Sequence, residues 1–243
     1  MKPPTAARLH AALEATWPPA ARHPCGPFTL RDGAGGGKRV SAATLEGGLS
    51  PGAIDAAEAA MRAAGAPPLF MIRAGEDALD GALDARGYRK VDPTQFHVAP
   101  AADLAEAPRP SSLFDCWPPL ALQKQIWRDA GIGPDRLAVM DRAGEPRTAF
   151  IARFRNRAAG VGFLAIDDDI AMMHALEIEP GFRRQGVARY MLRGMADWAC
   201  ARGAMWFALA VTERNVAARG LYAALGMVEA GGYHYRQAPE DTP

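Results

Sequence analysis

The chain has 243 residues with a formal net charge of +1, and 49% of them are hydrophobic, which is typical of a globular protein of one or two domains. Proteins that bind nucleic acids are usually more basic, so we expect no nucleic-acid partner. The three cysteines are far apart and no histidine stands at zinc-ligand spacing, which favours a reducing, cytoplasmic environment over disulfides or a metal site. We also expect no membrane span, because no apolar run reaches about 18 residues, and no signal peptide, because the first residues lead into a polar amphipathic segment rather than an apolar core.

The first hundred residues are predicted to alternate helices with short strands. From the spacing of apolar residues, helices are expected over 6–16, 53–64 and 77–85, and strands over 28–31, 39–44 and 69–72. The glycine-rich stretch 33–37 lies between two of these strands. It lacks the first glycine and the Ser or Thr of a Walker A loop, so we interpret it as the turn of a hairpin rather than a phosphate loop.

The next segments along the chain are a linker and a series of strands. The Pro- and Ala-rich stretch 99–110 is predicted to be a linker between two domains. A helix is then expected over 120–130, and strands over 137–141, 148–154, 160–166 and 170–179. Asp167, Asp168 and Asp169 separate the last two strands. Nothing nearby supplies the other ligands that Ca²⁺ requires, so we interpret these aspartates as a solvated turn.

A short polar loop then leads into an amphipathic helix predicted over 187–202. Gly186 and Ala188 are small, so the N–H groups at the start of this helix can face an anion at the positive end of the helix dipole. Arg183 and Arg184 add two cations to the same turn. The loop is therefore predicted to hold phosphate.

The sequence around this loop resembles the GNAT superfamily of acyl-CoA N-acyltransferases. The spacing Arg183-x-x-Gly186-x-Ala188 follows a strand that ends in Ile178-Glu179-Pro180, as in that family. Downstream, the family's Asn, Leu-Tyr and Leu-Gly-aromatic positions are matched by Asn215, Leu221-Tyr222 and Leu225-Gly226-Met227, where Met227 departs from the usual aromatic residue. The resemblance implies acetyl-CoA as cosubstrate. It assigns acetyl-CoA binding to Leu176, Ile178, Arg183, Arg184, Gln185, Gly186, Val187, Ala188 and Asn215.

Acetyl transfer from a thioester to an amine needs a base, a donor to the developing oxyanion and an acid for the leaving thiolate. The resemblance assigns the acid to Tyr222 and the oxyanion donor to the N–H of Ile178, on a strand that separates from its neighbour. It places a candidate base at His174. Strand alternation predicts that His174, Leu176 and Ile178 share one face and Glu177 the other. Glu177, or water bridging backbone groups, is the alternative base.

The two halves of the chain resemble each other. An offset of 139 residues aligns 207–211 with 68–72 without a gap, so the halves are predicted to be repeats of one unit. The same offset aligns Tyr222 with Leu83, so the N-terminal copy is degenerate where the chemistry is expected. Coincidence between two alanine-rich segments is the alternative explanation.

These observations predict an α/β fold of two GNAT-like halves, each a central mixed β-sheet flanked by helices. Residues 1–105 are expected to form the degenerate domain and residues 106–243 the acetyl-CoA-binding domain. The expected function is acetyl transfer, without a metal, to a primary amine of a small molecule, a peptide N-terminus or a lysine, directly in a ternary complex. A non-catalytic acyl-CoA-binding protein and an enzyme with a longer acyl donor are the alternatives, and a homodimer is left open.

Overall fold

The structure, a computed structural model, describes residues 2–239. These residues form two compact units that are discontinuous in sequence. Unit 1 comprises the chain up to Pro18 together with Phe96–Val211 and Asn215–Ala230, and unit 2 comprises Pro19–Gln95, Thr212–Arg214 and the chain from Gly231. Compactness therefore divides the chain differently from the expected repeat domains 1–105 and 106–243, which stay a prediction.

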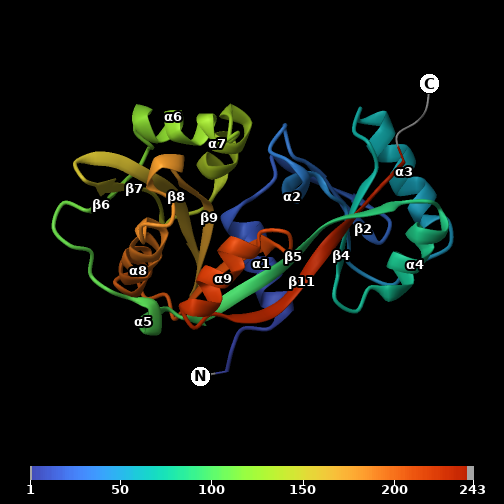
Figure 1. The fold of residues 1–243 in the computed structure, drawn as a ribbon. Helices are drawn as coiled ribbons and strands as arrows, with labels where there is room; N and C mark the ends of the chain where they lie inside the picture. The colour runs from blue at the N-terminus through green and yellow to red at the C-terminus, as the bar shows by residue number, and fades with distance from the viewer. Residues whose placement is uncertain (1, 240–243) are drawn as a thin grey trace. The chain divides into compact units, whose positions relative to one another are not determined.

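Unit 1 is a mixed sheet between two layers of helices (Figure 1). Its elements are α1 Ala6–Thr16, the end of β5 Arg89–Pro100, α5 Ala101–Leu104, β6 Leu113–Cys116, α6 Ala121–Asp129, α7 Pro134–Arg142, β7 Arg147–Phe154, β8 Arg157–Asp167, β9 Ile170–Ile178, the 3₁₀ turn η1 Pro180–Phe182, α8 Val187–Cys200, β10 Trp206–Thr212, α9 Val216–Ala224 and the start of β11 Val228–Gln237. The strand order is β5-β10-β9-β8-β7-β6, with β6 to β9 antiparallel and β10 parallel to β9.

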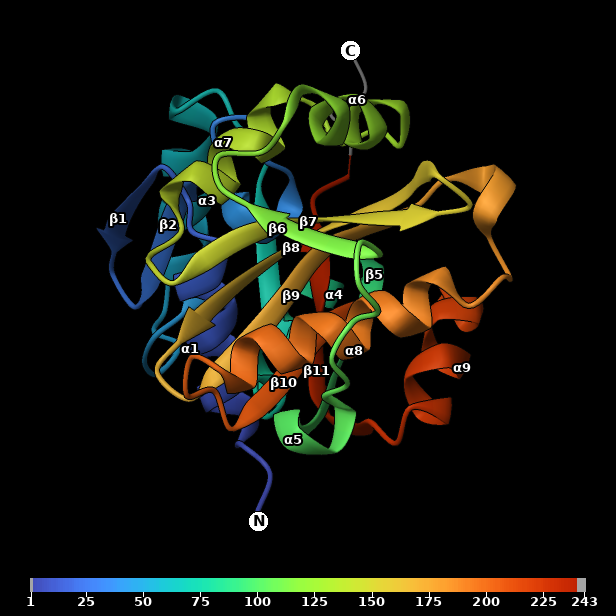
Figure 2. The ribbon, with the colours of Figure 1, turned by 90° about the vertical axis from the view of Figure 1, so that its left-hand side faces the viewer.

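The two faces of this sheet are covered by different helices. Met191 and Met195 of α8 and Tyr222 of α9 belong to an apolar core on one face. On the other face, Trp17 at the end of α1 packs edge-on against Phe163 of β8, with ring centroids 6.1 Å apart. Figure 2 shows α8 crossing in front of the sheet and α1 behind it. Both faces are thus buried, which explains the almost continuous apolar runs of β8 and β9.

Two expectations for unit 1 are wrong. Residues 137–141 are not a strand but part of α7, because Pro134 occupies the first turn and starts a helix that buries Val139 and Met140. The stretch 99–110 is not simply a linker. It begins with the end of β5 and with α5, whose Ala101 and Leu104 lie in the core beside α8. Burial of small and apolar residues, which composition alone does not reveal, decides both cases.

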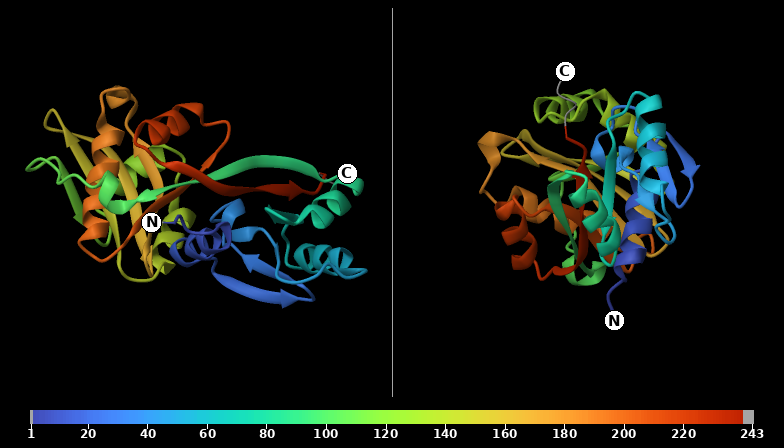
Figure 3. Two further views of the ribbon diagram at one scale, coloured as in Figure 1. Left: turned by 90° about the horizontal axis from the view of Figure 1, so that it is seen from below. Right: turned by 90° about the vertical axis from the view of Figure 1, so that its right-hand side faces the viewer.

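Unit 2 contains a small antiparallel sheet and a second group of strands. Its elements are β1 Ala21–Cys25, β2 Phe28–Asp32, α2 Lys38–Ser41, β3 Thr44–Leu45, α3 Ala53–Ala63, β4 Leu69–Arg73, α4 Asp77–Ala85, the first part of β5 and the second part of β11. Strands β1-β2-β3 form the small sheet, and β4-β11-β5 are neighbours in that order. β5 and β11 run side by side in Figures 1 and 3. The core includes Phe28, Ile54, Phe70 and Leu79.

The predicted hairpin around 33–37 is also wrong. β2 pairs with β1 and β3 instead, and the glycine-rich stretch leads into α2. Gly37 has a φ of 95° where the helical turn begins, and the Ser41 hydroxyl donates to Gly37 O. The buried Val40, which suggests a strand in the sequence, is therefore a core residue of a helical turn.

The last strand of each half of the sequence, β5 or β11, pairs with a strand of the other half. In unit 1 the strand beside β10 is the end of β5, and in unit 2 the strand beside β4 is the end of β11. The successions β4-α4-β5 and β10-α9-β11 have the same order, and α4 and α9 have nine residues each. This agreement supports the predicted repeat, which stays a prediction. None of the helices within the described residues is long and apolar enough to cross a membrane.

Candidate active site

β9 and β10 are paired only over their first residues. The paired residues run from Ile170 and Trp206 to Met173 and Leu209, although both strands continue beyond these pairs. The last residues of β9 therefore have an edge that β10 does not occupy. This is the separation of strands that the family resemblance implies.

A β-bulge lies in β9 where the two strands separate. Ala175 has a φ of 50°, and the register with β8 shifts there, so that Phe163 lies opposite His174 but Val161 opposite Glu177. The indole N–H of Trp127 in α6 donates to the carbonyl oxygen of Ala175 at 2.8 Å. The bulge adds one residue to β9 and thereby shifts the alternation of every side chain that follows.

The expected distribution of side chains on β9 is consequently wrong. Because Phe163 and Val161 are two residues apart on β8, their partners His174 and Glu177 lie on the same face of the sheet. Leu176 and Ile178 lie on the opposite face, packed against the core that contains α8. Simple alternation fails here because it assumes a strand without an extra residue.

His174 is enclosed by α1. Its side chain is 3% exposed, and its ring stacks on Trp17 with centroids 4.9 Å apart. Its Nε2 lies 2.8 Å from Thr16 Oγ1, and that hydroxyl donates its one proton to Ala12 O at 2.6 Å. Thr16 therefore accepts from His174, which places the imidazole proton on Nε2. This arrangement ties β9 to α1.

The pKa values of Glu177 and Tyr222 are both raised. Burial raises the pKa of the half-buried Glu177, while the charges of Arg183 and Arg136 oppose the rise. Tyr222, in α9, is 6% exposed, and burial together with the charge of Glu177 raises its pKa to about 12. The site thus contains a carboxylate of raised basicity and a phenol that stays protonated at neutral pH, which are the two kinds of group that general base and general acid chemistry uses.

Two side chains of the loop between β9 and α8 donate hydrogen bonds to nearby backbone carbonyl oxygens. Arg183 Nε donates to Ile178 O at 3.0 Å, and Gln185 Nε2 donates to Gly181 O at 2.9 Å. Gly186, with a φ of 83°, is the N-cap residue of α8 and supplies no side-chain cap, and the first turn has no acidic residue. Within this turn, Val187 buries its side chain in the core. The first N–H groups of α8 have the geometry of an anion site.

Asn215 begins the helix that carries Tyr222. Its Oδ1 accepts from Ala218 N at 3.2 Å, so it is the N-cap of α9. Its assignment to acetyl-CoA binding stays a prediction, as do the assignments of Leu176, Ile178 and the loop residues.

Sequence reasoning missed three side chains that build this site. Trp127 holds the bulge, and Thr16 holds His174. The third, His97 of β5, is 2% exposed and packs against Tyr222 with ring centroids 5.6 Å apart. It comes from the N-terminal half of the sequence, so no local motif links it to the site.

Arg8 of α1 places one positive charge beside the three aspartates at the turn from β8 to β9. Arg8 Nη1 donates to Asp167 Oδ2 at 2.6 Å, and its Nη2 lies 3.5 Å from Asp169 Oδ1 and 3.8 Å from Asp168 Oδ2. Asp168 has a φ of 54° in the turn. Within residues 2–239, no group of three or more His, Cys, Asp or Glu side chains is arranged to hold a metal ion.

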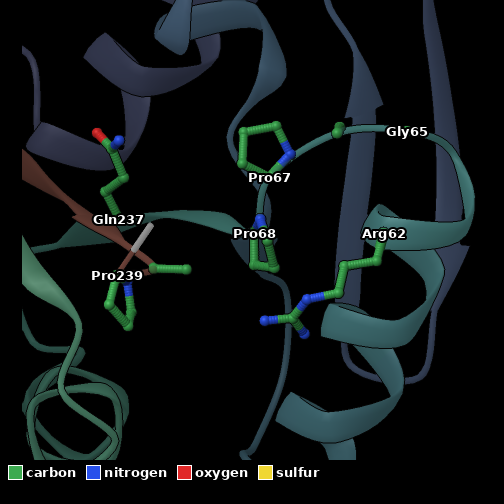
Figure 4. A pocket seen from close by; sticks show the side chains of 8 residues that line it. Arg62, Gly65, Pro67, Pro68, Gln237 and Pro239 are labelled. Atoms are coloured by element: carbon green, nitrogen blue, oxygen red, sulfur yellow. The ribbon is translucent and has the colours of Figure 1, made fainter. Parts of the chain in front are cut away.

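A separate pocket of about 680 Å³ lies in unit 2 (Figure 4). It is lined by Arg62, Gly65, Ala66, Pro67, Pro68, Gln237, Ala238 and Pro239. None of the predicted site residues lines it. The only ionisable side chain among its lining residues is Arg62, which pairs with Glu58 at 3.1 Å.

Comparisons with known proteins identify the family and the fold of this chain. Residues 104–227, about half of the chain, match the Acetyltransferase (GNAT) family. The Uncharacterized N-acetyltransferase YobR of Bacillus subtilis (strain 168) is 24% identical over 241 residues, which cover 94% of this chain and 97% of YobR. A GCN5-related N-acetyltransferase from Kribbella flavida has a similar fold, with a TM-score of 0.68, 16% identity and coverage of 96% and 95% of the two chains. A tandem GNAT protein from the clavulanic acid biosynthesis pathway has a TM-score of 0.58, 15% identity and coverage of 95% and 87%. The family match, spread over the strands and loop described above, shows that this chain belongs to the GNAT family of acetyltransferases.

Proposed function

We propose that this protein is an acetyl-CoA-dependent N-acetyltransferase that transfers the acetyl group directly to a primary amine within a ternary complex. The observation that carries the proposal is the separation of β9 from β10 beyond Met173 and Leu209, which leaves an edge of β9 free in the segment that carries Glu177. Membership of the GNAT family supports the use of an acyl-CoA donor.

Glu177 is the base in this scheme. Its raised pKa makes it a better proton acceptor than an ordinary carboxylate, and it is only half-buried. His174, the other candidate, is enclosed by Trp17 and Thr16. For an amine with a pKa near 8, deprotonation at pH 7 costs about 1 kcal/mol, but for a lysine-like amine it costs about 4 to 5 kcal/mol. The importance of Glu177 therefore increases with the basicity of the acceptor.

The free edge of β9 supplies the oxyanion donor. Glu179 N, directly after β9, donates to Ala159 O of β8. Because successive N–H groups of a strand point to opposite edges, the N–H of Ile178 points to the edge that β10 has left. There it can donate to the thioester carbonyl, whose oxygen becomes negative in the tetrahedral intermediate.

Tyr222 acts on the leaving sulfur. Its pKa of about 12 lies well above the value of about 8.5 for a thiol, so complete proton transfer to the thiolate is uphill by about 4 to 5 kcal/mol unless the phenolate is stabilised. A hydrogen bond from the phenol to the sulfur has no such cost. We therefore assign Tyr222 as the hydrogen-bond donor to the sulfur. The proton passes fully to the sulfur when the negative charge that it leaves on the Tyr222 oxygen is stabilised.

The test is calorimetric titration with acetyl-CoA, followed by a thiol-release assay over a panel of small amines, peptides with free N-termini and lysine peptides. Acetyl-CoA binding with thiol release on one class of amine supports the proposal and identifies the acceptor. Binding without release identifies a non-catalytic acyl-CoA-binding protein, and faster release from a longer acyl-CoA revises the donor. No binding at all contradicts the placement of acetyl-CoA on residues 176–188.

A further inference from the structure

His97 lies level with the point where β9 and β10 separate. It belongs to the end of β5, which lies beside β10. Two hydrogen bonds of 2.8 Å, from Ala101 N to Met205 O and from Glu213 N to Pro93 O, show that the two strands are antiparallel. This register places His97 opposite Leu209, the last residue of β10 that pairs with β9. Opposite residues share a face, so His97 points to the face that carries α9.

The imidazole of His97 is buried without a hydrogen bond. Within the described residues, neither of its ring nitrogens has a hydrogen-bond partner, and the residue is 2% exposed. Its ring contacts the ring of Tyr222, and its Nε2 is 4.0 Å from Glu229 Oε1. Glu229 is itself paired with Arg219 at 3.0 Å. Buried polar groups nearly always form hydrogen bonds in folded proteins, so a buried imidazole without one points to a hydrogen bond that forms during function.

The charge state of His97 follows from its neighbours. Burial lowers its pKa, Glu229 of β11 raises it, and Arg219 of α9 lowers it. The net effect is a lowered pKa, which keeps the imidazole neutral at pH 7. A neutral imidazole offers one N–H donor and one acceptor nitrogen. Among the groups around it, Tyr222 is the one whose oxygen becomes more negative in the proposed reaction.

We propose that His97 is a positioning residue for Tyr222, whose oxygen accepts a hydrogen bond from the His97 imidazole N–H as negative charge develops there. This inference rests on the proposed function. When the carbon–sulfur bond breaks, the Tyr222 proton passes to sulfur and the phenol becomes a phenolate. Glu177 releases to solvent the proton that it took from the amine, and a proton from solvent returns to Tyr222, so the products are the amide and the free thiol with no net acid consumed. The hydrogen bond from His97 stabilises the phenolate between these two steps.

The experiment compares two substitutions of His97 in two backgrounds. His97→Phe removes both nitrogens and keeps an aromatic ring, and His97→Gln keeps an N–H donor. Each is made in the wild type and in Tyr222→Phe, and kcat, KM for acetyl-CoA and thiol release are measured with the amine identified above. His10→Gln is the matched control, because the His10 ring packs edge-on against Phe96, the neighbouring residue of β5, with centroids 4.9 Å apart.

We expect His97→Phe to lower kcat about 10-fold or more, with KM for acetyl-CoA unchanged, and His97→Gln to retain most of the activity. In the Tyr222→Phe background, His97→Phe should have no further effect, because the group through which it acts is gone. Unchanged kcat in His97→Phe, or the same loss in both backgrounds, overturns the inference while leaving the proposed function intact. If the wild type binds acetyl-CoA but releases no thiol with any amine, the proposed function and this inference fail together.

Discussion

The indole N–H of Trp127 donates to the carbonyl oxygen of Ala175, the residue with positive φ at the bulge in β9. This one hydrogen bond joins α6 to the point where β9 changes its alternation. Because the bulge places Glu177 on the face of His174, the position of the proposed base depends on a side chain from a distant helix.

Trp127→Phe should therefore weaken both stability and catalysis. Loss of the indole donor leaves a strained carbonyl unpaired, and we expect the free energy of unfolding to fall by about 1 to 3 kcal/mol. Chemical denaturation measures this change, and thiol release measures the accompanying loss of kcat. Trp198→Phe is the control, because its indole donates to Asp115 at an exposed site, where solvent screens the charge and replaces the lost hydrogen bond, so it should cost less than about 1 kcal/mol. Equal effects of the two substitutions would contradict the role of the bulge.

His174→Ala should cost stability but keep the pH profile of kcat/KM. The substitution removes the stacking on Trp17 and the hydrogen bond to Thr16, so we expect unfolding to become easier by about 2 to 4 kcal/mol. If instead the acid limb of the profile disappeared in a folded His174→Ala protein, His174 would be the base and Glu177 would not.

Arg183→Ala should weaken acetyl-CoA binding without unfolding the protein. Arg183 is exposed beside the start of α8, and a hydrogen bond to a charged group is worth about 1.5 to 3 kcal/mol, so we expect roughly a tenfold or greater increase in Kd. Calorimetry at low and high salt measures the effect, which salt should reduce. Arg202→Ala, at the other end of α8 and stacked on Trp198, is the control. An unchanged Kd in Arg183→Ala would contradict the placement of the acetyl-CoA phosphates in this loop.

Unit 2 should become less stable in acid through Asp80. Arg236 and then His234 lower the pKa of Asp80 to about 2, against an ordinary value of 3.8. The native carboxylate is thus favoured above pH 4, and its contribution is lost as pH falls from about 4 to about 2. After allowance for solvent screening we expect it to be about 1 to 2 kcal/mol. Acid unfolding of Asp80→Asn should lack this component, and identical acid transitions in variant and wild type would contradict the assignment.

Several helices and the loop at Gly186 could be predicted because their signals lie in residues close together in the sequence. The loop at Gly186 and the helix that follows it are predicted by small residues and apolar spacing, and α4 by the same helical pattern. Pro134, by contrast, starts a helix where the apolar residues after it suggest a strand.

The missing parts of the site are long-range relationships. The bulge at Ala175 follows from the pairing of β9 with β8 and from Trp127, which is 48 residues away. His97 reaches Tyr222 only because β5 lies beside β10. The pairing of β5 with β10 and the bulge in β9 depend on tertiary packing, so no local pattern of residues predicts them.

The pH dependence of kcat/KM in Glu177→Gln tests the central claim most directly. With an amine acceptor identified, the wild-type kcat/KM should fall as pH is lowered through the raised pKa of Glu177, because the protonated carboxyl cannot accept the amine proton. Glu177→Gln should lower kcat/KM at pH 7 by about 10²- to 10³-fold, lose that acid limb, recover partly at high pH and bind acetyl-CoA as the wild type does. A Glu177→Gln protein with the wild-type rate and the wild-type acid limb would contradict the account.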